Sequence, residues 1–353
     1  MASIKDLPDE IILKVTNYLE LKDLAKFGEV SKKMRIISSD QSLWKKINLS
    51  KNGPGFWRYE IVVPFDFLKM AIENGCQYLS LQYMNLGNSG EPISMTSEGD
   101  LCLDKASSLK YLNLNYCDAH VLTFEEILAS CHSLEKLSIA GKFLTFKMIQ
   151  SICYQNGPTL QTLNLSCCSG LDLEAIQNIT KNCAGLKNVD LIATGLSKDS
   201  INLLVNNLTP GVEKLALGDL SNLKDKHVKA LVARCNKLSV LNLERTKISD
   251  ASLTYIIKNL QHTLEKLNVR YCHGITYNIL LHNITELKSM SKLRVLNYGR
   301  MGRFPNHEKE SLKRLMPMVK FGESICVDER ELLLADGIWD VEAKQLEIWK
   351  MWV

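Results

Sequence analysis

The chain has 353 residues, and its 43 basic and 39 acidic side chains leave a net charge of only +4. A charge so close to balance does not indicate bulk electrostatic binding to nucleic acid. Hydrophobic residues at 46% and charged residues at 23% are typical of a folded soluble protein, and no apolar run approaches the roughly 18 residues of a membrane helix.

The first 30 residues carry charges throughout, so we expect no signal peptide. In a long chain without such a signal, the 11 cysteines predict reduced thiols rather than disulfides. We therefore expect the protein in the cytoplasm, the nucleus or both.

Residues 3–49 predict a small helical module. Pro8 can open a helix at its first position, and an apolar stripe with helical spacing follows at Ile11, Ile12, Val15, Tyr18 and Leu19. Asp23 and Ser31 can cap a second and a third helix, and Leu43-Trp44 closes the module. Because about forty residues bury too little surface to be stable alone, the module should complete its core against something else.

Residues 50–321 are built on the pattern L-x-x-L-x-L. Its central apolar residue recurs at positions 112, 137, 163, 189, 215, 241, 267 and 296, with five consecutive intervals of 26 residues. Weaker copies stand at Ile47-x-Leu49, Leu79-x-Leu81 and Val319-x-Phe321, and residues 87–107 predict a surface loop. We expect an α/β fold: a leucine-rich-repeat horseshoe of about ten repeats, each a short strand followed by a covering helix. Ser249 and Asp250, for example, can cap a helix with apolar positions at Leu253, Ile256, Ile257 and Leu260.

Six cysteines follow the repeat. Cys131, Cys183 and Cys235 are spaced by two repeats, and Cys117, Cys168 and Cys272 each come five residues after a strand marker. Such positions predict buried thiols that pack as small hydrophobic groups. The alternative of a metal site has little support, since no C-x-x-C is present and Cys117-x-x-His120 stands alone. We expect no metal and no cofactor.

The residues beside the strand leucines should face the concave side. The residues one position after each marker form a mostly polar row, which we call the polar ladder: Ser80, Asn113, Ser138, Asn164, Asp190, Ala216, Asn242, Asn268 and Asn297. Near the N-terminal end the flanking positions are tyrosines, Tyr78, Tyr83, Tyr111 and Tyr116. Near the C-terminal end they are basic, with Lys214, Arg245, Lys266, Arg270, Tyr271 and Arg300. A row of arginines can bind phosphate or carboxylate, and a solvated face is the alternative.

The tail, residues 322–353, has eight acidic and three basic residues and also Trp339, Trp349 and Trp352. Its aromatic side chains must bury somewhere. Three roles remain open: folding back over the basic concave face, binding a partner, or capping the last repeat. Trp349 is a candidate for the edge of the substrate site.

A resemblance to the F-box is carried across residues 4–45 by Leu7-Pro8-x-Glu10-Ile11-Ile12, Leu19, Leu24, Val30-Ser31-Lys32 and Leu43-Trp44. Met34 stands where the family usually has Trp. With its cysteine-containing repeats, the chain resembles the F-box/leucine-rich-repeat substrate receptors of SCF ubiquitin ligases. Tyr298-Gly299, Glu310–Leu315, Val319–Phe321 and Glu347–Lys350 resemble the end of a cell-cycle member of this family.

The resemblance implies a non-catalytic substrate receptor. The adaptor, the S-phase kinase-associated adaptor protein, would contact Leu7, Pro8, Ile11, Ile12, Leu19, Leu24, Val30, Leu43 and Trp44 and connect the chain to a cullin scaffold. The substrate, a protein with an acidic or phosphorylated degron, would contact Arg245, Lys266, Arg270, Tyr271, Arg300 and Trp349. In the cell-cycle member a small cyclin-dependent-kinase accessory subunit helps the receptor to bind its substrate, and the resemblance implies the same accessory subunit as a possible partner here. Neither nucleic acid nor membrane is an expected partner.

Two other functions are open. The chain could be an interaction scaffold or inhibitor without a ligase role, and failure to co-purify with adaptor and cullin would favour this. It could also be a small-molecule receptor, which a co-purified ligand would reveal. No motif of a nucleophile, a nucleotide loop or a zinc protease supports an enzyme acting alone.

Overall fold

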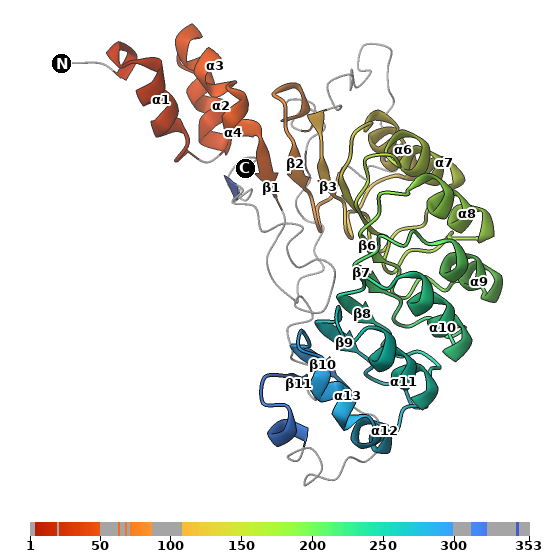
Figure 1. The fold of residues 1–353 in the computed structure, drawn as a ribbon. Helices are drawn as coiled ribbons and strands as arrows, with labels where there is room; N and C mark the ends of the chain where they lie inside the picture. The colour runs from red at the N-terminus through yellow and green to blue at the C-terminus, as the bar shows by residue number, and fades with distance from the viewer. Residues whose placement is uncertain are drawn as a thin grey trace. The chain divides into compact units, whose positions relative to one another are not determined.

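The computed structural model describes residues 4–19, 21–49, 63, 68, 71–86, 108–298, 312–322 and 344–345. The chain forms two compact units (Figure 1). The first comprises Met1–Ser138 with Val341–Val353, and the second comprises Ile139–Asp340. The domain limits predicted above, 3–49, 50–321 and 322–353, stay predictions, and the predicted loop at 87–107 lies outside the described residues.

The first unit begins with the predicted helical module. A 3-10 turn, Ile4–Asp6, precedes four helices, α1 (Asp9–Thr16), α2 (Leu21–Glu29), α3 (Lys32–Ser38) and α4 (Gln41–Trp44). Ser31 caps α3 by accepting a hydrogen bond from the Met34 amide, as predicted. Asp23 lies inside the first turn of α2, so the prediction that it caps this helix is wrong.

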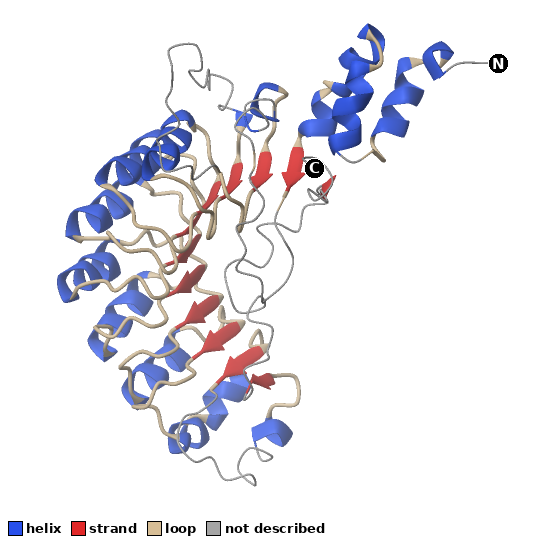
Figure 2. Cartoon of the chain, turned by 180° about the vertical axis from the view of Figure 1, so that it is seen from behind, coloured by secondary structure: helices blue, strands red, loops and turns tan. Residues whose placement is uncertain are grey.

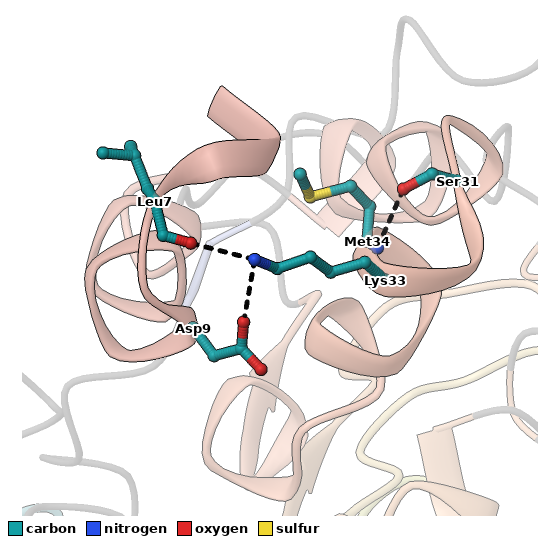
Figure 3. A network of polar contacts seen from close by, with 5 residues as sticks. All are labelled: Leu7, Asp9, Ser31, Lys33 and Met34. Atoms are coloured by element: carbon teal, nitrogen blue, oxygen red, sulfur yellow. Dashed lines mark hydrogen bonds and ion pairs between the residues drawn. The ribbon is translucent and has the colours of Figure 1, made fainter. Parts of the chain in front are cut away.

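Buried side chains and one lysine hold the module together. Ile12, Met34 and Ile37 form its core, with Phe27 packed against them. Lys33 Nζ lies 2.9 Å from the Leu7 carbonyl oxygen and 3.1 Å from Asp9 Oδ1 (Figure 3). These two contacts join the start of α1 to α3.

Four parallel strands follow in the first unit. They are β1 (Lys46–Asn48), β2 (Tyr78–Ser80), β3 (Tyr111–Asn113) and β4 (Lys136–Ser138), with helix α6 (Val121–Ser130) after β3. Ile47, Leu79, Leu112 and Leu137 are direct partners across these strands. A short strand of the tail, β12 (Lys344–Gln345), pairs in parallel with the other edge of β1. The remainder of the tail lies outside the described residues.

The second unit has seven parallel strands. They are β5 (Thr162–Asn164), β6 (Asn188–Asp190), β7 (Lys214–Ala216), β8 (Val240–Asn242), β9 (Lys266–Asn268), β10 (Val295–Asn297) and β11 (Lys320–Gly322). From β5 to β10 neighbouring strands pair through the marker residues of the repeat. At β11 the partner of Leu296 is Phe321, so the weak copy is displaced by two residues from the expected marker, Val319.

Helices cover one side of these strands (Figure 2). They are α7 (Phe146–Gln150) with a π-helical turn (Ser151–Gln155), α8 (Leu173–Asn182), α9 (Lys198–Asn207), α10 (Asp225–Arg234), α11 (Asp250–Asn259), α12 (Tyr277–His282) and α13 (Ile284–Ser289). In α11 the Ser249 cap and the burial of Leu253, Ile256 and Ile257 match the prediction. The α/β repeat fold predicted from the sequence is thus confirmed.

The six repeat-phase cysteines are buried, as predicted. The thiols of Cys117, Cys168 and Cys272 donate hydrogen bonds to carbonyl oxygens of the preceding repeat, at 2.9 to 3.1 Å. Burial raises the pKa of Cys131 to about 12 and that of Cys235 to about 11. The thiols of Cys131 and Cys235 therefore stay protonated, and all six cysteines pack as small apolar groups within the repeats.

A left-handed residue stands three residues after the end of β2, β3, β5, β6, β7, β8 and β9. Non-glycine residues with φ from 53° to 64° stand there: Tyr83, Tyr116, Cys167, Ala193, Asp219, Arg245 and Tyr271. This conformation costs about 1–2 kcal/mol. A backbone hydrogen bond to the next repeat offsets the cost, as from Arg245 N to Arg270 O at 2.8 Å. Side chains at this place project from the ends of the strands.

Candidate interaction surfaces

The first candidate surface is an exposed apolar row that begins two residues before α1 and continues along it. Leu7, Ile11 and Val15 follow one another at a spacing of four residues and are 39%, 42% and 45% exposed. Pro8 is exposed beside them, and Val30 is 59% exposed at the end of α2. Apolar side chains aligned on one helix face and left in water are typical of a protein-binding surface.

The other residues predicted to contact an adaptor lie elsewhere. Ile12 and Leu24 are completely buried, Leu43 and Trp44 are 1% and 2% exposed, and Leu19 is half-buried. Trp44 Nε1 also donates a hydrogen bond to the Ser38 carbonyl oxygen at 2.6 Å. The four buried side chains support the module from within and offer a partner no surface. The adaptor contacts expected from the sequence stay a prediction, and Leu7, Pro8, Ile11 and Val30 are the members of that set that are exposed in the free chain.

The polar ladder has a structural role. The side-chain oxygens of Asn164, Asp190, Asn242 and Asn268 each accept a hydrogen bond from the backbone N–H two residues later. All four side chains are at most 5% exposed. The ladder closes the turn after each strand and leaves a partner little to contact.

The N-terminal tyrosines are in contact in pairs. The rings of Tyr78 and Tyr111 meet edge to face, with 4.2 Å between centroids, and those of Tyr83 and Tyr116 stack at 5.4 Å. Tyr111 Oη lies 3.5 Å from Glu135 Oε2. Burial, followed by the charges of Tyr78 and Glu135, raises the pKa of Tyr111 to about 12. Its phenol therefore stays neutral and can donate to Glu135.

The second candidate surface lies on β8, β9 and the turns that follow them. Two guanidinium groups lie near the ring of Tyr271: Arg245 Cζ is 5.1 Å and Arg270 Cζ is 4.9 Å from its centroid. Arg245 is exposed and lies 3.8 Å from Asp219 Oδ2. The structure thus brings three of the predicted substrate-binding residues together. We call Arg245, Arg270 and Tyr271 the arginine–tyrosine clamp.

The remaining predicted substrate residues have different outcomes. Lys266 lies half-buried at the start of β9, and Arg270 lies two residues after the end of that strand. Arg300 and Trp349 lie outside the described residues. Glu244 is not among the candidate residues of the sequence analysis. Its Oε2 accepts a hydrogen bond at 2.9 Å from Nδ2 of Asn268, two residues before Arg270.

Among the described residues, no group of three or more His, Cys, Asp or Glu side chains is arranged to hold a metal ion. The same part of the chain contains no helix long and apolar enough to cross a membrane.

The described residues thus form a helical module with an exposed apolar row, followed by leucine-rich repeats. Comparison with known families specifies the class. Residues 4–50 match the F-box-like family, and residues 91–326 match the SKP2 LRR domain family. The chain belongs to the F-box/leucine-rich-repeat proteins with repeats of the SKP2 type. The cell-cycle member that its C-terminal segments resemble is the S-phase kinase-associated F-box protein.

Similar curated proteins include F-box/LRR-repeat protein 4 of Bos taurus, with 26% identity over 75% of this chain and 38% of that protein. DNA repair protein rhp7 of Schizosaccharomyces pombe is 28% identical over 55% of this chain and 35% of that protein. F-box/LRR-repeat protein 21 of Bos taurus is 23% identical over 61% and 52%. The chain thus spans between about a third and a half of the length of these relatives.

A solved structure shares the fold. Yeast Rad7, in its complex with Elc1, superposes with a TM-score of 0.52 over 89% of this chain and 88% of that chain, at 16% identity. At this identity the likeness describes the fold alone.

Proposed function

We propose that the protein is the substrate-recognition subunit of an SCF-type cullin–RING ubiquitin ligase. The F-box module docks on the adaptor, the adaptor connects it to the cullin, and the repeats hold a protein substrate. The chain itself is non-catalytic: ubiquitin transfer is accelerated because a substrate lysine is held near a conjugating enzyme elsewhere in the complex. The cytoplasm and the nucleus are the compartments in which we expect it.

The observation that carries this proposal is the exposed row of Leu7, Ile11 and Val15 within a segment that matches the F-box-like family. A soluble module gains nothing by exposing aligned apolar side chains unless a partner covers them. Rad7, which has a similar fold, was solved in complex with Elc1, and this supports a stable protein partner for the present chain.

Co-purification with the adaptor and cullin tests the docking. Leu7→Ala combined with Ile11→Ala should weaken adaptor binding strongly, because truncation of a central interface residue costs roughly 2–4 kcal/mol. Phe146→Ala removes an apolar side chain of similar exposure from the second unit and serves as the control. If wild-type protein fails to bring down adaptor and cullin, the chain is an interaction scaffold or inhibitor instead.

On the substrate side, we propose that an acidic or phosphorylated degron binds at the arginine–tyrosine clamp with Lys266, and at Arg300 and Trp349. The SKP2-type repeats favour a phosphorylated cell-cycle regulator as substrate, with a small cyclin-dependent-kinase accessory subunit. Arg270→Glu with Arg300→Glu should abolish substrate capture and leave adaptor binding unchanged. Deleting residues 335–353 should strengthen capture if the acidic tail competes, and weaken it if the tail completes the site.

A further inference from the structure

Two lysines and two tyrosines form a continuous strip across the strands of the first unit. Each stands at the first position of its strand and is a direct partner of the next across the sheet: Lys46, Tyr78, Tyr111 and Lys136. All four side chains are half-buried. Because side chains alternate along a strand, they lie on the face opposite the buried marker residues. We call these four residues the lysine–tyrosine strip.

The members of the strip hold one another in place. Lys46 Nζ lies 5.4 Å from the centroid of the Tyr78 ring, and Lys136 Nζ lies 4.7 Å from that of the Tyr111 ring. The two rings meet edge to face between these cations. A cation at each end of an aromatic pair is therefore already positioned before a partner arrives, and binding costs little side-chain ordering.

The acceptor groups beside the rings are engaged within the protein. Glu135 accepts hydrogen bonds from Lys110 Nζ at 2.9 Å and from Tyr111 Oη at 3.5 Å. Asn113 Oδ1 accepts a hydrogen bond from the Asn115 amide at 3.0 Å. The strip therefore offers a partner two cations and aromatic ring surface, while these acceptors are already used and do not await the N–H groups of a peptide.

We propose that the lysine–tyrosine strip binds a proline-rich segment of a partner protein that carries an acidic residue at each end of the prolines. Proline has no backbone N–H, so a proline-rich segment needs few acceptors on the surface that binds it. Such segments are preformed in the polyproline II conformation, and their rings pack against aromatic side chains. The lysines at the two ends of the strip attract the carboxylates.

The spacing of the strands sets the spacing of the acidic residues. Lys46 and Lys136 are separated by three strand pairings, which corresponds to about 14 Å at roughly 4.8 Å per strand. A polyproline II helix rises about 3.1 Å per residue, so this distance corresponds to about four or five residues. The expected ligand has its two acidic residues at that separation, with prolines between them.

This inference goes beyond the proposed function. The strip belongs to the first unit, whereas the arginine–tyrosine clamp belongs to the second. It also lies outside helices α1 to α4, which carry the exposed apolar row. Peptide binding at the strip therefore does not depend on a ligase role, and the two proposals can fail separately.

Selection from a peptide library tests the occupant. The full chain is presented with peptides that have aspartate at both ends of a random centre of the expected length. Wild-type protein should enrich proline in the centre, and a matched library with lysine in place of both aspartates should give no binders. Equal recovery from the two libraries, or binders without proline, would overturn the inference.

Reversal of the two charges tests the position of the site. Lys46→Glu combined with Lys136→Glu should weaken binding of the selected acidic peptides about tenfold or more, because two attractive contacts become repulsive. The same variant should bind peptides in which lysine replaces the aspartates, and this gain shows that the protein is still folded. Tyr78→Ala should weaken both kinds of peptide, since it removes ring surface that both contact. Acidic peptides that bind the charge-reversed variant as tightly as the wild type would refute the site.

The control is Lys229→Glu, which reverses a lysine 5.9 Å from the ring centroid of Tyr255 in the second unit. This variant should select the same peptides as the wild type. A single-stranded oligonucleotide is offered in parallel, because nucleic-acid bases also stack on tyrosines beside cations. If it displaces the peptides and binds more tightly, nucleic acid is the occupant and the proposal is wrong. Protein that selects the peptides but does not bring down adaptor and cullin would refute only the proposed function.

Discussion

Replacing Asp190 by asparagine should stabilise the protein at neutral pH. Asp190 occupies the ladder position that holds asparagine at 164, 242 and 268, and its Oδ1 accepts the same hydrogen bond, from the Ile192 amide at 3.0 Å. The side chain is 2% exposed. Burial, helped by the charge of Glu244 and opposed by the Ile192 hydrogen bond, raises the pKa of the Asp190 carboxyl to about 7.

The raised pKa fixes the sign and size of the effect. Below about pH 4 the folded and unfolded states both hold the proton; between about pH 4 and 7 only the folded state keeps it, so stability falls as pH rises. The shift from 3.8 to about 7 spans three pKa units. At 1.36 kcal/mol per unit, the buried carboxylate costs up to about 4 kcal/mol above pH 7.

Urea unfolding of wild type and Asp190→Asn at pH 5 and pH 8 measures this difference. The variant should gain about 2–4 kcal/mol at pH 8 and less at pH 5, because the asparagine does not titrate. Comparing the two proteins cancels the titration of every other group. Equal stability at pH 8, or a variant less stable than wild type, would show that Asp190 is ionised in the fold at no cost.

Three further outcomes are expected. Ile12→Ala, which truncates a buried side chain, should destabilise the helical module by about 2–5 kcal/mol in thermal unfolding. Ile11→Ala, which truncates an exposed side chain, should cost less than about 0.5 kcal/mol. Similar losses of stability in both variants would contradict the assignment of a buried and an exposed face. In urea unfolding, Gly170→Ala should lower the free energy of unfolding by more than Gly195→Ala. Both glycines have a positive φ, but at Gly170 a Cβ would also lie 2.3 Å from the Leu144 carbonyl oxygen, whereas at Gly195 it would meet no atom within 4 Å. Native alkylation should be slow at the buried thiols of Cys131, Cys183 and Cys235, and labelling as fast as in urea would refute their burial.

The repeat fold could be predicted from the sequence because the same apolar pattern recurs in every repeat. A 26-residue interval, held over five intervals, fixes the register of neighbouring strands, since any slip would turn the marker leucines away from the core. The cap at Ser249 and the buried cysteines follow from the same phase. The F-box resemblance rested on several anchors in order and agrees with the family match.

Only the tertiary structure decided which face of each element is covered. The stripe from Ile11 to Leu19 contains both faces of α1, and adjacent isoleucines at 11 and 12 differ because α3 packs against one of them. A helical period identifies an apolar set but does not say what will pack on it. The asparagine ladder likewise reads as a polar surface until the turns show that its oxygens are used by the backbone.

The contacts within the arginine–tyrosine clamp could not be predicted from the spacing of residues in the sequence. The sequence placed Arg245, Arg270 and Tyr271 in equivalent phases, but the left-handed turns direct Arg245 and Tyr271 so that two cations share one ring. Burial is a property of the packed repeats, so the sequence could name Arg270, and only the fold shows that this arginine is 8% exposed.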